Sequence, residues 1–144
     1  MHYEIMSRAA ARQATYAKSA PLTAVISITD TGSKKNLFYP QPWLIDILEL
    51  QFDDVEETGA HAITREQAKE IAVFADNNYK RVKRFIIHCE FGQSRSVGIA
   101  AAISKHFEGH DSGIFATPGY MPNRTCYRYV LEALKNRVDM KRRN

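Results

Sequence analysis

The chain has 144 residues, of which 44% are hydrophobic and 25% are charged, a balance typical of one globular domain, predicted over residues 1–144. No apolar stretch approaches the length that crosses a bilayer, which argues against a membrane protein. The net charge of +4, from 20 Lys and Arg against 16 Asp and Glu, comes without a basic stripe interleaved with aromatic residues, so nucleic acid is not an expected partner.

Segments that favour strands alternate along the chain with segments that favour helices. Apolar and β-branched runs predict strands at residues 4–6, 23–29, 45–52 and 83–88. Helical patterns and start signals predict helices at residues 7–18, 64–77 and 96–107, and a last helix opened by Pro122 and Asn123. Polar stretches with glycine or proline predict loops at residues 30–42, 53–62 and 109–121. This alternation predicts an α/β fold with a mostly parallel sheet.

The segment most informative about chemistry covers residues 88–96, where a buried strand gives way to a helix. Cys89 stands at the end of the strand and Arg95 at the start of the helix. A loop curled over a helix N-terminus points several backbone N–H groups at one spot, where the helix dipole adds positive charge. Such a site binds a dianion such as phosphate and also stabilises a thiolate.

The order His88, Cys89, five residues, Arg95, Ser96 resembles the signature loop of the cysteine-dependent protein tyrosine phosphatases. The sequence has no long insertions on either side of this loop, and in this respect it is most similar to the small dual-specificity branch. The resemblance covers residues 23–138. It implies a four- or five-stranded sheet with helices on both faces, and hydrolysis of phosphotyrosine and of phosphoserine or phosphothreonine without a metal or other cofactor.

The resemblance implies a role for each matched residue. Cys89 is expected to attack phosphorus as a thiolate and to form a phosphocysteine intermediate that water hydrolyses. Arg95 would clamp two phosphate oxygens with its planar guanidinium fork. Ser96 would donate a hydrogen bond to the thiolate, and could also cap the helix. His88 would orient the loop, the alternative being an ordinary buried histidine.

The residues between Cys89 and Arg95 are expected to bind phosphate through their backbone N–H groups. With the arginine, this phosphate-binding set comprises Glu90, Phe91, Gly92, Gln93, Ser94 and Arg95. Gly92 is expected to adopt a backbone conformation that a Cβ would penalise. The carboxylate of Glu90 would repel highly anionic ligands, which argues against polyphosphoinositide substrates.

A general acid must protonate the leaving oxygen, and the phosphatases take it from an aspartate on a loop before the active strand. The alternating apolar pattern of the preceding strand stops at Phe52 and is followed by Asp53 and Asp54. The family pattern of one spacer and then an aspartate favours Asp54, with Asp53 or a merely solvated acidic loop as alternatives. Asn123 resembles the asparagine that supports the active loop in the small phosphatases, and it could cap the last helix.

The N-terminal residues and the cysteine count indicate the expected compartment. Residues 1–6 lack the charged start and apolar run of a signal peptide, and the two cysteines do not suggest a disulfide framework. We therefore expect a cytoplasmic protein, where a nucleophilic thiolate stays reduced. The expected partner is a phosphorylated protein or a small phosphoester, and not a membrane.

Three other interpretations stay open from the sequence. The same chemistry could act on RNA 5′-phosphates or on small phosphoesters. A phosphate-binding module would keep the loop and hydrolyse nothing. A rhodanese-type fold can carry a similar cysteine loop, although the candidate Asp54 upstream of the loop and the helix pattern downstream of it argue against this fold.

Overall fold

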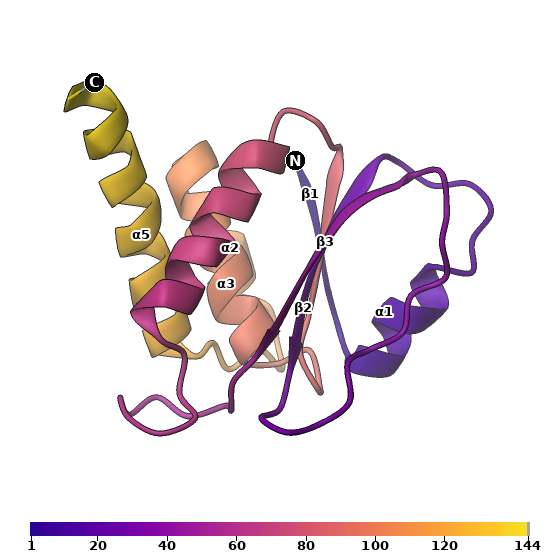
Figure 1. The fold of residues 1–144 in the computed structure, drawn as a ribbon, viewed down its shortest axis with the longest axis horizontal. Helices are drawn as coiled ribbons and strands as arrows, with labels where there is room; N and C mark the ends of the chain where they lie inside the picture. Colours follow the sequence, from indigo (N-terminus) through magenta and orange to yellow (C-terminus); the bar gives the residue numbers. More distant parts are fainter. Residues whose placement is uncertain (144) are drawn as a thin grey trace.

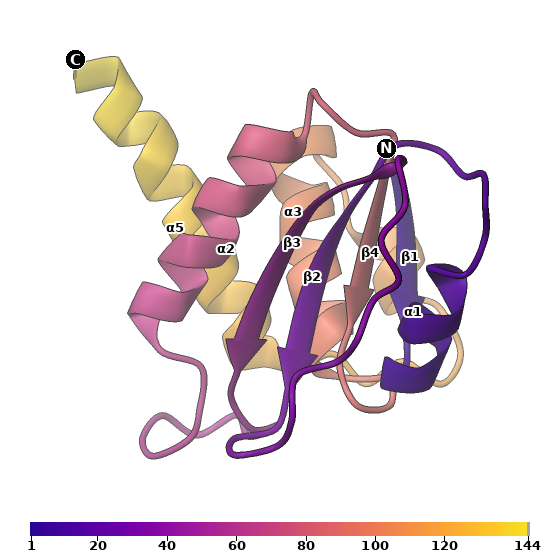
Figure 2. The same ribbon diagram turned by 45° about the vertical axis from the view of Figure 1, so that its right-hand side comes forward.

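The computed structural model, described over residues 1–143, contains one sheet of four strands in the order β1-β4-β2-β3. The strands are β1 (His2–Met6), β2 (Thr23–Thr29), β3 (Leu44–Gln51) and β4 (Arg84–His88). All strand pairs are parallel, and in Figure 2 the arrowheads point the same way. The carboxyl ends of the strands therefore meet at one edge of the sheet. Residue 144, the last of the predicted domain, lies outside the described residues.

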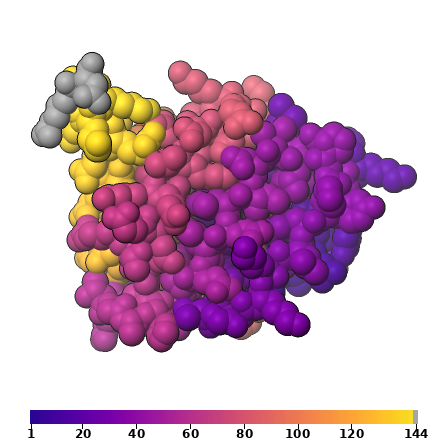
Figure 3. Space-filling view, in the orientation of Figure 1, coloured from indigo at the N-terminus to yellow at the C-terminus, as the bar shows by residue number. Residues whose placement is uncertain are grey.

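Helices cover both faces of the sheet. α1 (Arg8–Ala14) lies on one face, and α2 (Arg65–Asn78), α3 (Arg95–Glu108) and α5 (Arg124–Arg143) lie on the other, as Figure 1 shows. The C-terminal end of α5 projects from the body of the molecule (Figures 2 and 3). Within the described residues, no helix is both long and apolar enough to cross a membrane.

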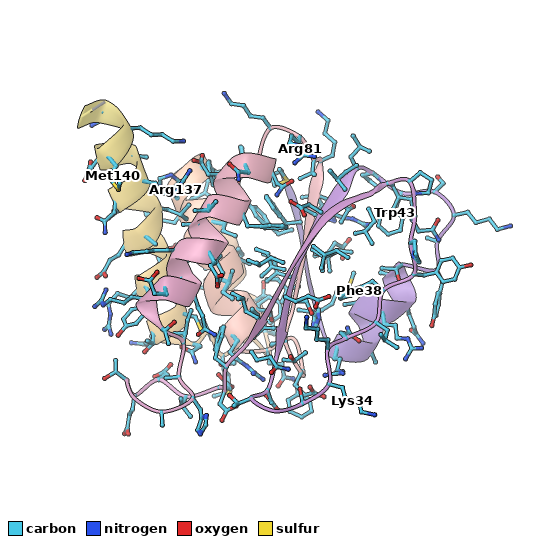
Figure 4. All side chains as sticks on the ribbon, viewed as in Figure 1. Lys34, Phe38, Trp43, Arg81, Arg137 and Met140 are labelled. Carbon is cyan, nitrogen blue, oxygen red and sulfur yellow. The ribbon has the colours of Figure 1, made fainter. Side chains whose placement is uncertain are left out.

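The two central strands are apolar on both faces because both faces are covered. All seven residues of β2 are buried, as expected for the middle of a parallel sheet. Since side chains alternate along a strand, Ile26 and Ile28 pack toward the large helical layer, whereas Val25 packs toward Ala11 of α1. Phe38 belongs to this smaller cluster, and Figure 4 shows it together with Trp43 on the α1 side.

The predicted α/β fold is confirmed, with four strands, all parallel, and helices on both faces. The first strand begins at His2 and not at residue 4, and two larger differences from the prediction concern a helix end and a loop. The first helix ends at Ala14 and not at residue 18, because the Thr15 hydroxyl and amide both bond the carbonyl of Arg12. The predicted loop at residues 109–121 contains a single helical turn, α4 (Ser112–Phe115), closed by a bond from the Ala116 amide to the Ser112 carbonyl.

Gly98 lets α3 and α5 approach closely. A Cβ at this position would lie 2.4 Å from the carbonyl oxygen of Asn123 and 3.2 Å from the Cβ of Cys126. The small-residue run of α3 therefore places the start of α5 directly beside the loop that follows β4.

Candidate active site

The predicted signature loop lies at the carboxyl end of β4, where it turns into α3. A cavity of ≈ 590 Å³ opens there, at the edge of the sheet where open α/β folds bind ligands. Its lining comes from the loop, from the segment after β3 and from the start of α5: Asp54, Glu56, Cys89, Phe91, Gln93, Ser94, Arg95, Met121, Pro122 and Arg124. The structure thus brings Cys89, Arg95 and Asp54 together.

Cys89 is buried, with 2% of its surface exposed, and its sulfur lies 3.1 Å from the hydroxyl oxygen of Ser96. Burial by itself raises the pKa of the thiol, but hydrogen bonds from the Ser96 hydroxyl and from the amides of Ser96, Ser94 and Gly92 outweigh it and lower the pKa. The arrangement therefore favours a thiolate at the floor of the cavity. Ser94, the residue before the first helical residue, makes no side-chain capping bond to α3.

Gly92 has a φ of +71°, in the region that favours glycine. A Cβ there would also lie 2.5 Å from the carbonyl carbon of Met6. The junction between β1 and α1 therefore packs directly against the loop, and the Arg8 amide bonds the carbonyl of Glu90 at 3.1 Å. This packing explains why the loop needs glycine at the predicted position.

Arg95 is held by one end of its guanidinium group. Its Nη1 donates to the Phe52 carbonyl at 2.7 Å and lies 2.8 Å from Oδ1 of Asp30, while 4% of the side chain is exposed. Among the described residues, its buried Nε has no hydrogen-bond partner. A buried N–H without a partner costs free energy, so an oxyanion above the loop would satisfy it.

Asp30 was missed by the sequence-based prediction, which placed it in an ordinary loop. It follows β2, the neighbour of β4 in the sheet, so it reaches the same edge as the signature loop.

We expect Asp30→Ala to weaken inorganic phosphate binding about tenfold, because a charge-assisted bond that orients Arg95 is lost. The inhibition constant of inorganic phosphate measures this change in affinity. Lys80→Ala, in the exposed turn between α2 and β4, is the control, and an equal loss in both variants would refute the orienting role.

Asp54 faces the cavity, whereas Asp53 does not line it. Oδ1 of Asp54 accepts hydrogen bonds from the Ser94 hydroxyl at 2.7 Å and from Nδ2 of Asn123 at 3.0 Å. Asp53 points instead to the loop after β2, where the amide of Thr31 donates to it and lowers its pKa. The geometry therefore agrees with the choice of Asp54 over Asp53, while the acid role itself stays a prediction.

Asn123 connects three segments. Its Oδ1 accepts a bond from the Cys126 amide, as a helix cap does, and its Nδ2 donates to Asp54 and to the carbonyl of Val55. Its backbone amide donates to the carbonyl of Ser94 at 3.0 Å. The residue therefore contacts the signature loop through its backbone and supports the aspartate loop through its side chain.

His88 is a buried, neutral histidine beneath the loop. Its Nδ1 lies 3.2 Å from the Cys89 carbonyl, and its Nε2 lies 2.6 Å from the Ser27 hydroxyl and 3.3 Å from Nδ2 of Asn36. Nδ1 must donate to the carbonyl, so Nε2 accepts from its two partners. Burial lowers the pKa of His88 to about 4. This bonding orients the carbonyl of Cys89, as the orienting role requires.

We expect the free energy of unfolding to fall by up to about 3 kcal/mol between pH 6.5 and pH 4 because of His88. The unfolded chain protonates this ring near its ordinary pKa, whereas the folded protein keeps it neutral to about pH 4. The unfolded state binds more protons in this window, so stability is fully present above it and is lost as the pH falls. Denaturant titrations measure the slope, and His88→Gln should flatten it. An unchanged slope in the variant would contradict this expectation.

Of the remaining loop residues, Phe91, Gln93 and Ser94 line the cavity, whereas Glu90 does not. Glu90 lies 4.0 Å from Nη1 of Arg8, so its charge is partly compensated. Phe91 and Met121 are each 76% exposed and stand with Pro122 at the rim. Met121 and Pro122 were not predicted from the sequence, because their place depends on a bond from the Met121 amide to the Gln93 carbonyl.

The second cysteine and the other titratable groups add no further ligand cluster. Cys126 is a free, buried thiol whose pKa is raised by burial, so it packs as a small core residue. Within the part of the chain that the structure describes, no group of three or more His, Cys, Asp and Glu side chains is arranged to hold a metal ion.

These features define a site in which hydrogen bonds favour a thiolate beside an arginine whose Nε is free for an oxyanion. No protein-family model matches the sequence, and no curated protein sequence matches it. Solved structures do match. Human DUSP28 has a TM-score of 0.62 at 12% identity, with 96% of this chain and 94% of DUSP28 covered.

Two further solved structures are similar. A mouse protein described as a dual-specificity phosphatase, complexed with zinc tungstate, has a TM-score of 0.60 at 14% identity, covering 94% of this chain and 83% of its own. PTPMT1 in complex with PI(5)P has a TM-score of 0.56 at 16% identity, covering 83% and 81%. The chain therefore has the fold seen in these solved dual-specificity phosphatase structures.

Proposed function

We propose that the protein is a phosphatase that hydrolyses phosphate monoesters, above all phosphotyrosine, through a phosphocysteine intermediate. The observation that supports this best is the Cys89 sulfur 3.1 Å from the Ser96 hydroxyl, in a cavity lined also by Arg95 and Asp54. Phosphoserine and phosphothreonine are further candidate substrates. The exposed apolar rim formed by Phe91 and Met121 favours an aromatic ester, since it would contact the ring of the leaving group.

The proposed first step transfers the phosphoryl group to sulfur. The Cys89 thiolate attacks phosphorus, an S–P bond forms and the P–O bond to the leaving group breaks. Asp54, protonated at the start, gives its proton to the leaving oxygen. The loop amides and the free edge of the Arg95 guanidinium group stabilise the charge on the equatorial oxygens.

In the proposed second step, water attacks the phosphorus of the phosphocysteine. The Asp54 carboxylate accepts the proton of the water, the S–P bond breaks and inorganic phosphate leaves. The Ser96 hydroxyl donates to the departing sulfur and stabilises it as a thiolate. The enzyme returns to its starting protonation state after one turnover.

In this proposal the loop amides and Arg95 supply the positive charge that other phosphatases draw from metal ions. The test is hydrolysis of 4-nitrophenyl phosphate in buffer containing EDTA. Turnover that survives EDTA supports the proposal, and turnover that requires added metal refutes the metal-independent mechanism. No turnover with or without metal would favour a phosphate-binding module that hydrolyses nothing.

We propose the cytoplasm as the location of the protein, because a thiolate nucleophile stays reduced there.

A further inference from the structure

A second cavity of ≈ 820 Å³ lies beside the active-site cavity, along the exposed side of α5. Pro122 and Arg124 line both cavities, so the two are direct neighbours. We call this second cavity the α5 groove. A peptide that places one residue over Cys89 therefore reaches the groove by passing the side chains of Pro122 and Arg124.

The basic residues of the α5 groove follow one face of the helix. Arg124, Arg128 and Lys135 line it together with Leu131, at intervals of four, three and four residues. Residues at these intervals lie on one helical face. At about 1.5 Å per residue the row is about 16 Å long, which matches about five residues of an extended peptide.

The charges of this row are not paired with carboxylates of the described residues, although the Arg128 guanidinium lies over the Tyr129 ring, 5.6 Å from its centroid. Among the described side chains, none of Arg124, Arg128 and Lys135 forms a salt bridge, and all three are exposed. The one acidic residue that lines the groove, Glu132, is already paired with Arg65 at 2.8 Å. The groove therefore attracts negative charge.

The apolar wall of the groove favours a peptide over a nucleic acid. Phe115 and Tyr127 pack edge to face with their ring centroids 5.2 Å apart, and the Tyr127 hydroxyl bonds Asp111. Rings fixed against each other in this way offer an apolar surface to a side chain. Single-stranded nucleic acids are instead bound on aromatic faces that are free for bases to stack.

We propose that the α5 groove binds the peptide segment next to the phosphorylated residue of the substrate, and that this segment carries acidic residues interspersed with an apolar one. The inference rests on the proposed function. With the phosphorylated residue over Cys89, the chain passes Arg124, its acidic side chains pair with Arg128 and Lys135, and its apolar side chain contacts Leu131.

The test compares phosphotyrosyl peptides of equal length whose flanking residues are acidic, alanine or lysine. For the unmodified protein, kcat/KM for the acidic peptide should exceed that for the lysine peptide about three- to tenfold, the range of a few exposed ion pairs. The preference should shrink as the salt concentration rises. The variant Arg128→Glu with Lys135→Glu should abolish it while leaving the turnover of 4-nitrophenyl phosphate unchanged.

The matched control is Lys18→Glu with Lys80→Glu, which changes the net charge equally at exposed positions outside both cavities. It should retain the preference. Equal kcat/KM for all peptides, or an equal loss in both double variants, would overturn the proposal. The proposal would also be overturned if a 5′-phosphorylated RNA oligonucleotide were hydrolysed better than every peptide and lost this advantage in the groove variant.

Binding measurements separate this inference from the proposed function. Fluorescence anisotropy with Cys89→Ser reports the affinity for each peptide without turnover. If the acidic peptide binds more tightly and this preference is lost with the two groove substitutions, the groove proposal is supported. This holds even if the unmodified protein hydrolyses no ester, a result that would refute only the phosphatase function. Equal binding of all peptides by a protein that does hydrolyse 4-nitrophenyl phosphate refutes the groove alone.

Discussion

Replacing Cys89 with serine should reduce turnover of 4-nitrophenyl phosphate by about 10⁴-fold or more, the scale seen when a covalent nucleophile is removed. A serine hydroxyl stays protonated at neutral pH, whereas the hydrogen bonds around Cys89 lower its pKa and favour the thiolate. The loop amides and Arg95 are untouched, so tungstate or phosphate should still bind. Steady-state kinetics and calorimetric titration with tungstate measure the two effects.

The second cysteine provides the control for this prediction. Cys126 is buried and does not line the cavity, so Cys126→Ala should keep most of the activity. Appreciable turnover in Cys89→Ser would exclude the covalent mechanism. Loss of tungstate binding in that variant would show that the sulfur is needed to shape the loop, and not only to attack.

Replacing Asp54 with asparagine should slow esters with poor leaving groups by about 10²–10⁴-fold, the usual contribution of a general acid. Phenyl phosphate and phosphotyrosine peptides belong to this group. An activated ester such as 4-nitrophenyl phosphate should be affected far less, because its phenolate leaves without a proton. The fall of the rate on the basic side of the pH profile should also flatten, since that limb reports the loss of the acidic proton.

Asp53→Asn serves as the matched control, because Asp53 precedes Asp54 directly but bonds Thr31 outside the cavity. It should change the rates little. If Asp53→Asn shows the dependence on the leaving group instead, Asp53 and not Asp54 is the general acid. If neither variant shows it, another group donates the proton.

The parts of the site that are contiguous in sequence could be predicted from it. The strand, loop and helix around Cys89 and Arg95 form one uninterrupted segment, and its small residues and glycine indicate the turn. The layered fold followed in the same way from the alternation of strands and helices. Asp54 could be favoured over Asp53 because the apolar alternation ends at Phe52 and the pattern of the phosphatases that the sequence resembles puts one spacer before the acid.

The supporting contacts could not be predicted, because they depend on which strands are neighbours. Asp30, Ser27 and Asn36 reach the signature loop only because β2 lies next to β4. Nothing in the local sequence of these polar residues distinguishes them from ordinary strand and loop residues. The turn α4 was missed for another reason, since four residues are too few to show a helical period.

The bonds of Asn123 make the site depend on distant parts of the chain. They tie residue 123 to Asp54, 69 positions earlier, and to the segment that carries Cys89. Because α5 also contributes Val130 and Leu134 to the main hydrophobic core, the aspartate is fixed opposite the sulfur only when this last helix has packed. Closing so long a stretch of chain costs entropy. Recovery of activity during refolding therefore reports the packing of the whole domain, with the C-terminal helix included.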